Sequence, residues 1–411
     1  MKPSRPARSA PARPGMRPWR FVVMFGVVSL LMDVVYEGAR SITGPLLASL
    51  GASAVVVGVV TGAGEAAALV LRLGSGPLAD RSGRFWAWTI AGYVLTAVTV
   101  PLLGLAGVLW AAATLVIAER VGKAVRSPAK DTLLSHAAAV TGRGRGFGVH
   151  TALDQVGALI GPLTVAGLMA VTGDRYGPSL GVLALPGVAA IALLVWLRIR
   201  VPDPIAYEVP ASAAPDDRHP EDPPDRRAGA LPRSFWLYAA FTAAVLLGFA
   251  TFGVLSFHLV QRHLLSPAAV PLLYAAAMGA DALAALGTGW AYDRIGPRAL
   301  VALPLMAAAV PVLAFTDTRA LVVAGALAWG AALGIQESTL LATVADLVPP
   351  PRRATAYGLF AAVMGGATLA GGSLAGLLYS VSIPVLIIFT LAVQCAALSL
   401  LAVAQAGRRR R

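Results

Sequence analysis

The 411-residue chain has few charged side chains and almost no cysteine. Only 13% of its residues are charged, whereas 57% are hydrophobic. A soluble protein of this size needs more polar surface than this composition supplies, so the chain requires lipid as part of its solvent. The single cysteine, Cys395, lies in a late apolar segment, which excludes both an intramolecular disulfide and a cysteine metal cluster.

Motifs for ATP hydrolysis and for enzyme catalysis are also missing. No G-x-x-x-x-G-K-[ST] run occurs, which argues against ATP-driven transport. The five histidines offer no Ser/His/Asp or metal-ligand spacing, and no stretch reads as a selectivity filter. The sequence therefore predicts no enzyme, no cofactor and no metal site, and it disfavours a channel.

Long apolar runs occupy most of the chain. Each is about 20 to 30 residues long, which is enough to cross the hydrocarbon core of a bilayer. Six precede a polar stretch and six follow it, at 19–48, 55–78, 85–106, 108–128, 146–172, 178–198, 234–260, 267–290, 298–316, 319–345, 354–380 and 383–405. The expected fold is an all-α membrane protein with twelve transmembrane helices in two six-helix bundles, 19–198 and 234–405. Residues 199–233 are rich in proline and aspartate and predict a cytoplasmic linker.

The formal net charge of +13 lies mainly in the tails and in alternate loops. The tail 1–18 is basic and predicted to be disordered, and the tail 406–411 ends in four arginines. Basic loops also alternate with poorly charged ones, so both termini are predicted to be cytoplasmic in the inner membrane. This distribution argues against a nucleic-acid partner. The first apolar run is too long for a cleaved signal peptide, and Met16 is an alternative start.

A loop motif occurs twice, once in each half of the chain. The sequence G-x-x-x-D-R-x-G with a further arginine follows both the second and the eighth apolar run. The two copies are Gly76, Asp80, Arg81, Gly83 and Arg84, and Gly289, Asp293, Arg294, Gly296 and Arg298. Corresponding motifs at corresponding positions imply two halves of similar plan.

This double motif resembles the major facilitator superfamily, whose loop between helices two and three has the form G-x-x-x-D-R-x-G-R, with a weaker copy between helices eight and nine. The resemblance covers essentially the whole chain and does not resolve the subfamily. It implies two pseudo-symmetric bundles that face each other across a central cavity opening alternately to each side.

The motif residues are interpreted as a gate. Gly76 and Gly289 are expected to permit close helix approach, whereas Gly83 and Gly296 are expected to supply turn angles. Asp80 and Asp293 could each meet the positive N-terminal end of a helix from the other half, and the resemblance suggests the region of Arg353 for Asp80. A static salt bridge of Asp80 with Arg81 or Arg84 is the alternative.

Ionisable groups inside apolar runs are costly, so each is a candidate site. The proton-coupling or ion-pair candidates are Asp33, Glu37, Arg40, Glu65, Glu119, Arg120 and Asp154. Asp33, Glu65 and Asp154 are the candidate proton carriers, and Glu37 with Arg40 could instead form an outer gate. For any one of these residues, simple neutralisation that holds helices together is an equal alternative.

Residues of both halves are candidates for the substrate cavity. They are Tyr36, Lys123, Arg126, Gln155, Asp281, Trp329, Gln336 and Glu337. The basic stripe that includes Lys123 and Arg126 could bind an anionic substrate or lipid phosphates. Charges are fewer in the second half, so the first bundle is expected to handle protons and the second to shape a mostly apolar pocket.

The fifth run contains Gly157, Gly161 and Pro162, similar to the G-x-x-x-G-P element of antiporters in the superfamily. Its continuation differs, so export is only mildly favoured, and close helix packing explains the same residues. The predicted function is proton-coupled secondary transport of a small organic solute by a monomer, with membrane lipids as its other partner. A uniporter, an importer and a non-transporting receptor or scaffold of the same fold remain alternatives. Substrate identity and coupling ion are left open.

Overall fold

The computed structural model describes residues 15–207, 231–348 and 352–409, and every regular element in them is helical. Residues 1–14, most of the predicted linker and the last two arginines of the C-terminal tail lie outside the described residues. The first half contains α1 (Pro18–Ser49), α2 (Ala54–Val70), α3 (Arg72–Ser82), α4 (Phe85–Leu103), α5 (Leu109–Thr141), α6 (Arg143–Thr172), α7 (Tyr176–Gly181), α8 (Ala184–Arg200) and the 3₁₀ turn η1 (Pro204–Tyr207).

The second half follows the same plan. It contains α9 (Arg233–Leu247), α10 (Phe252–Gln261), α11 (Ala269–Ile295), the 3₁₀ turn η2 (Gly296–Val301), α12 (Ala302–Ala314), α13 (Arg319–Leu347), α14 (Arg353–Val381) and α15 (Ile383–Arg409). Three pairs of consecutive helices make one interrupted crossing each: α2 with α3, α7 with α8, and α9 with α10.

The number of crossings agrees with the prediction of twelve. Ten segments of the described residues are long and apolar enough to span a membrane. One of them, Ala269–Ala314, has 46 residues, about 70 Å of straight helix and over twice a hydrocarbon core of about 30 Å. It is broken at Gly296 (φ 61°) and therefore crosses twice. The helix α5 is absent from the ten because four charged residues, from Glu119 to Arg126, interrupt its apolar sequence, yet it packs along α4.

Each half has its own hydrophobic core. In the first, α1 is the central helix, and Phe21, Phe25 and Met32 are completely buried among its neighbours. In the second, Phe235, Phe241 and Phe360 belong to one apolar cluster, and Trp329 belongs to another. Two separate cores make each half a bundle, which leaves polar residues free to gather between them.

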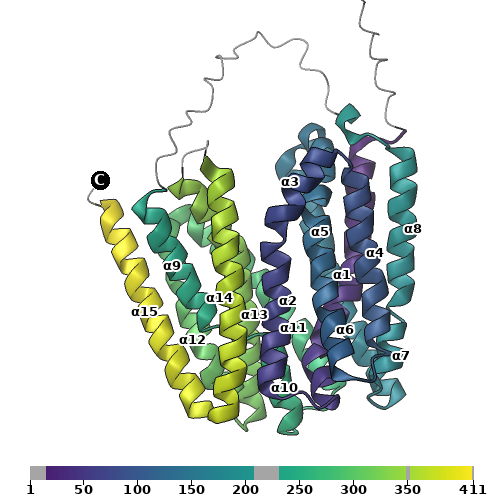
Figure 1. Cartoon of the computed structure of the whole chain (residues 1–411). Coiled ribbons are helices and arrows are strands. Elements are labelled where there is room, and N and C mark those ends of the chain that lie inside the picture. Colours follow the sequence, from purple (N-terminus) through teal and green to yellow (C-terminus); the bar gives the residue numbers. More distant parts are fainter. Residues whose placement is uncertain (1–14, 208–230, 349–351, 410–411) are drawn as a thin grey trace, which may run out of the picture.

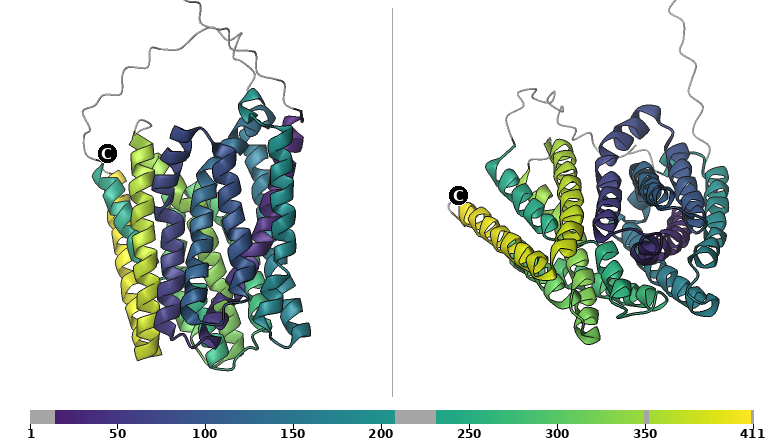
Figure 2. Two further views of the ribbon diagram at one scale, coloured as in Figure 1. Left: turned by 45° about the vertical axis from the view of Figure 1, so that its right-hand side comes forward. Right: turned by 60° about the horizontal axis from the view of Figure 1, so that its bottom comes forward.

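The two bundles approach each other most closely at one end. The start of α1 and the end of α15 lie at the same end of the molecule, here called the terminal end, and α10 lies at the opposite, α10 end (Figure 1). The bundles are close together at the α10 end and further apart at the terminal end (Figures 1 and 2).

Glycines make the contact at the α10 end. The backbone of Gly58 in α2 lies against Gly372 and Gly376 in α14, and a Cβ atom added to Gly58 would lie 3.3 Å from the Gly376 Cα. Gly44 in α1 lies equally close to Gly253 in α10. Because glycine has no side chain, these backbones touch directly.

Candidate functional site

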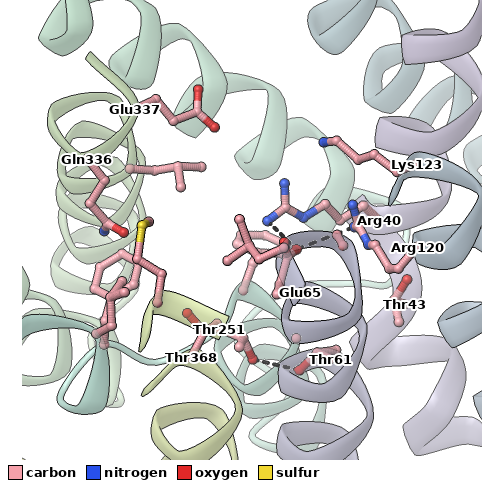
Figure 3. A pocket seen from close by; sticks show the side chains of 18 of the residues that line it. Arg40, Thr43, Thr61, Glu65, Arg120, Lys123, Thr251, Gln336, Glu337 and Thr368 are labelled. Atoms are coloured by element: carbon pink, nitrogen blue, oxygen red, sulfur yellow. Dashed lines mark hydrogen bonds and ion pairs between the residues drawn. The ribbon is translucent and has the colours of Figure 1, made fainter. Parts of the chain in front are cut away.

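A cavity of about 320 Å³ lies between the bundles. Helices α1, α2, α3 and α5 line it from one side, and α9, α10, α13 and α14 line it from the other, together with the residues that join α9 to α10. Its polar lining includes Arg40, Thr43, Thr61, Glu65, Arg120, Lys123, Thr251, Gln336, Glu337 and Thr368 (Figure 3). Arg72 also belongs to this lining. Aromatic surface comes from Phe249, Phe252 and Trp329. The cavity therefore offers charged, hydrogen-bonding and apolar contacts together.

Glu65 organises the charges on the first-bundle wall. Its Oε1 lies 2.8 Å from Arg40 Nη2 and 3.6 Å from Arg120 Nη2. Arg120 also pairs with Glu119 at 3.2 Å, and Arg40 pairs with Glu37 at 3.4 Å. The five residues come from three helices and form one network, which is the pairing expected for charges inside a membrane.

The basic stripe of α5 does not face the cavity along its whole length. Lys123 lines the cavity and donates to the Tyr36 hydroxyl at 3.2 Å. Arg126 instead turns into the first bundle, where it donates to Thr96 Oγ1 at 2.9 Å and lies 4.8 Å from the centre of the Tyr93 ring. Neither Tyr36 nor Arg126 is among the residues that line this cavity, so their part in substrate binding stays a prediction. The helical rotation between positions 123 and 126 directs the two basic side chains of α5 differently.

A second polar cluster lies within the first bundle. His150 Nε2 contacts Lys130 Nζ at 3.0 Å, Ser29 Oγ at 3.3 Å and Asp154 Oδ2 at 3.5 Å. Asp33 is 9% exposed, and among its charged neighbours Asp154 has the largest electrostatic effect on it, followed by Lys123. Two of the proposed proton carriers, Asp33 and Asp154, therefore lie near each other, whereas Glu65 lies on the cavity wall.

The candidates of the second half divide into two groups. Trp329, Gln336 and Glu337 on α13 line the cavity. Asp281 of α11 is 2% exposed and accepts a hydrogen bond of 3.5 Å from Gln155 of α6, so this pair bridges the bundles instead of lining the cavity, contrary to the prediction. The backbone of Gly334 in α13 packs against the backbone of Asp281.

The two loop motifs lie at the terminal end, where the bundles are separated. Gly83 (φ 62°) and Gly296 (φ 61°) have the positive φ angles expected of them. Asp80 and Asp293 are exposed, and Arg294 lies 3.7 Å from the centre of the Trp290 ring. The side chain of Arg353, the suggested partner region of Asp80, lies outside the described residues.

Close helix approach explains the motif glycines less well than expected. A Cβ atom added to Gly76 would meet only Pro128, at an ordinary 3.8 Å, and one added to Gly289 would have no neighbour within 4 Å. The described residues show no close approach at Gly289 in this conformation, so its role in helix packing stays a prediction.

The glycines of α6 do serve close packing. A Cβ atom on Gly157 would lie 2.8 Å from the Asp33 Cβ, and one on Gly161 would lie 2.9 Å from the Gly38 nitrogen, both on α1. Pro162 follows within the same helix. The packing alternative therefore accounts for both glycines.

Several residues of the site were not recognised in the sequence. Tyr274 of α11 donates a hydrogen bond to Glu37 of α1, and Thr61 of α2 bonds to Thr251 before α10 at 2.8 Å. Asp174 accepts from the Ala268 backbone nitrogen at 2.9 Å. All three bonds join the two bundles. The hydroxyl residues Tyr274, Thr61 and Thr251 carry no charge signal in the sequence, so only their tertiary partners distinguish them.

Two membrane-spanning bundles around a central charged cavity define the class of membrane transport proteins. The chain belongs to the Major Facilitator Superfamily, whose family model matches residues 25–264 and 252–410. An uncharacterized protein of Mycobacterium tuberculosis (strain ATCC 25618 / H37Rv) is 64% identical over 393 residues, 95% of this chain and 94% of the relative. An uncharacterized MFS-type transporter of Methanocaldococcus jannaschii is 25% identical, over 88% of this chain and 89% of the relative.

Solved structures show the same fold at low sequence identity. The nucleoside transporter NupG is 14% identical with a TM-score of 0.69, covering 94% of this chain and 98% of that one. The peptide transporter POT in complex with sulfate is 14% identical with a TM-score of 0.72, covering 98% and 96%. An inward-facing bacterial homolog of the human lysosomal transporter Spinster is 15% identical with a TM-score of 0.69, covering 95% and 96%. The protein is therefore a multi-pass membrane protein with the transporter fold of this superfamily.

Proposed function

We propose that the protein carries a small organic solute across the cytoplasmic membrane by alternating access, coupled to protons. The cavity between the bundles supports this most directly, because it combines charged, hydroxyl and aromatic surface. Hydrogen bonds and glycine contacts join the bundles towards the α10 end. Rocking of one bundle against the other would break these contacts and expose the same cavity on the other side.

The uneven distribution of basic residues supports an orientation of the protein in the membrane. Basic residues gather in the tails and in the loops at the terminal end, so we propose that this end is cytoplasmic and that the structure represents an inward-facing state. In the outward-facing state the terminal end would be closed, and Asp80 would then reach the start of α14. Asp80→Asn is expected to raise the labelling of cytoplasmic-side probes without loss of fold, and unchanged labelling would contradict this gate.

Asp33 and Asp154 are the proposed proton carriers. Two carboxylates that influence each other in a buried cluster with His150 and Lys130 are suited to share a proton, because burial disfavours two adjacent negative charges. Glu65 is paired with two arginines and is proposed to sense the cavity instead. The resemblance of Gly157, Gly161 and Pro162 to the antiporter element leads us to propose export as the direction.

Proteoliposomes with an internal pH-sensitive dye test this function. Addition of a transported compound from a panel of small organic solutes should change the internal pH, whereas silence across the panel would favour a uniporter or a non-transporting receptor. Asp33→Asn and Asp154→Asn should abolish gradient-driven accumulation and spare solute exchange. Asp317→Asn removes an exposed carboxylate outside the cavity and should change neither. Normal accumulation in both Asp33→Asn and Asp154→Asn would refute the proton assignment.

A further inference from the structure

Two opposite charges on the cavity wall have no ionic partner among the described residues. Glu337 of α13 is exposed to the cavity and makes no ion pair or hydrogen bond with any other residue that the structure describes. Lys123 of α5 donates to the Tyr36 hydroxyl and lies over the Tyr36 ring, 4.5 Å from its centre, but it pairs with no carboxylate in the described ranges.

Most other charged side chains around the cavity do have ionic partners. Arg40, Glu65 and Arg120 neutralise one another in the network on the first-bundle wall. Arg72 adds a further positive charge on the same wall, and its buried Nε has no hydrogen-bond partner among the described residues. Unpaired positive charge therefore belongs to the first bundle, and unpaired negative charge belongs to the second.

The two unpaired charges face each other. Figure 3 shows the Lys123 ammonium and the Glu337 carboxylate on opposite sides of the space between the bundles. Lys123 and Arg40 are the described cations whose charge acts most strongly on the Glu337 carboxylate. When the cavity closes and loses its water, each of these charges requires a counter-charge, since an isolated ion in a dry interior is strongly disfavoured.

From this arrangement, and resting on the proposed transport function, we infer that the solute is a small organic zwitterion. Its anionic group pairs with Lys123, with Arg72 adding to the positive field, and its cationic group pairs with Glu337. Its apolar body lies against Phe252 and Trp329. A simple anion would leave Glu337 without a counter-charge, and a simple cation would leave Lys123 without one. The cavity volume of about 320 Å³ limits the solute to a small molecule.

Matched sets of ligands test this charge requirement. Isothermal titration calorimetry on the full chain in lipid nanodiscs would compare glycine, leucine and phenylalanine with their amides, which are cations, and their N-acetyl forms, which are anions. For at least one of the three, the zwitterion should bind about 10- to 100-fold more tightly than either singly charged form, because each charge contributes a charge-assisted contact. Equal binding by a singly charged form, or no binding by any of the nine compounds, would overturn the inference.

Variants assign each contact. Glu337→Gln should weaken zwitterion binding about 10-fold or more and leave binding of the N-acetyl form unaffected. Lys123→Gln should also weaken zwitterion binding and leave binding of the amide unaffected. Glu337→Asp should restore part of the affinity. Asp317→Asn is the matched control on the same bundle, and binding should not change. Glu337 has no hydrogen-bond or ion-pair partner among the described residues, so Glu337→Gln should keep the melting temperature. Equal zwitterion affinities for Glu337→Gln and Asp317→Asn would refute the assignment.

The proton-flux assay separates this inference from the transport proposal. Charge-selective binding without solute-dependent pH change would leave the zwitterion site standing and refute proton-coupled transport. Movement of neutral or singly charged solutes only, with no zwitterion bound, would support transport and refute the zwitterion class.

Discussion

The Tyr274 hydroxyl of the second bundle donates a hydrogen bond to Glu37 Oε2 of the first. Glu37 also pairs with Arg40, which pairs with Glu65 on the cavity wall. A continuous set of polar contacts therefore leads from the bundle interface to the cavity. Any solute that displaces Glu65 from Arg40 would also change the strength of the ion pair between Arg40 and Glu37. Binding of solute in the cavity would thereby be coupled to the Tyr274–Glu37 contact between the bundles.

Removal of the Tyr274 hydroxyl should weaken the inward-facing state. Tyr274→Phe deletes a buried hydrogen bond to a carboxylate, typically about 1.5 to 3 kcal/mol, and shifts the equilibrium towards opening at the α10 end. Labelling of Thr43→Cys by a membrane-impermeant maleimide, in a Cys395→Ser background, should rise. Tyr379→Phe is the matched control, because its hydroxyl bonds to His258 within the second bundle; equal labelling of both variants would argue against the role of Tyr274.

A side chain at Gly372 should block closure of the α10 end. A Cβ atom there would lie 2.9 Å from the Gly58 oxygen and 3.2 Å from the Gly62 Cα. Gly372→Val is therefore expected to increase labelling of the same cysteine at position 43 and to slow transport. On the same helix, Gly366 would have no neighbour within 4 Å, so Gly366→Val serves as the control and should behave like the parent protein. Indistinguishable labelling of the two variants would contradict a tight α2–α14 contact.

Neutralisation of Glu65 should destabilise the first bundle. Glu65→Gln leaves Arg40 and Arg120 without the carboxylate that they share, and Arg120 is only 6% exposed. Loss of one partner of a buried ion pair typically costs about 3 to 5 kcal/mol, and access of cavity water reduces this to roughly 1 to 3 kcal/mol. The melting temperature in nanodiscs should fall, and Glu65→Asp should recover part of it. An unchanged melting temperature for the neutral variant would show that the network carries little energy.

A side chain at Gly161 should disrupt the first bundle itself. Gly161→Val would overlap the α1 backbone near Val34 and Gly38, and such overpacking typically costs about 1 to 3 kcal/mol. Gly167→Val, further along α6 with open space around it, should have little effect on the melting temperature. If Gly161→Val instead abolished exchange while keeping full stability, the antiporter interpretation of this element would gain over packing.

Much of the architecture could be read from the sequence. A chain with 13% charged residues cannot cover its apolar runs with its own polar groups, so membrane crossing is dictated by composition. The repeated G-x-x-x-D-R-x-G pattern identified two halves of one plan. The turn glycines Gly83 and Gly296 were predictable because few other residues adopt their positive φ angles. Intramembrane charges such as Arg40 and Glu65 stood out because their burial is costly.

Which side chains face the cavity was decided only by the tertiary structure. Lys123 and Arg126 share one basic stripe in the sequence, but the packing of α5 directs Lys123 to the cavity and Arg126 to Thr96. Asp281 appeared to be a cavity residue until its bond to Gln155 placed it at the bundle interface. Tyr274 carried no signal at all, since a tyrosine in an apolar helix is unremarkable until its partner is known. Composition and periodicity determine that a residue lies in the membrane, whereas its direction depends on how helices rotate and pack against one another, which non-local contacts decide.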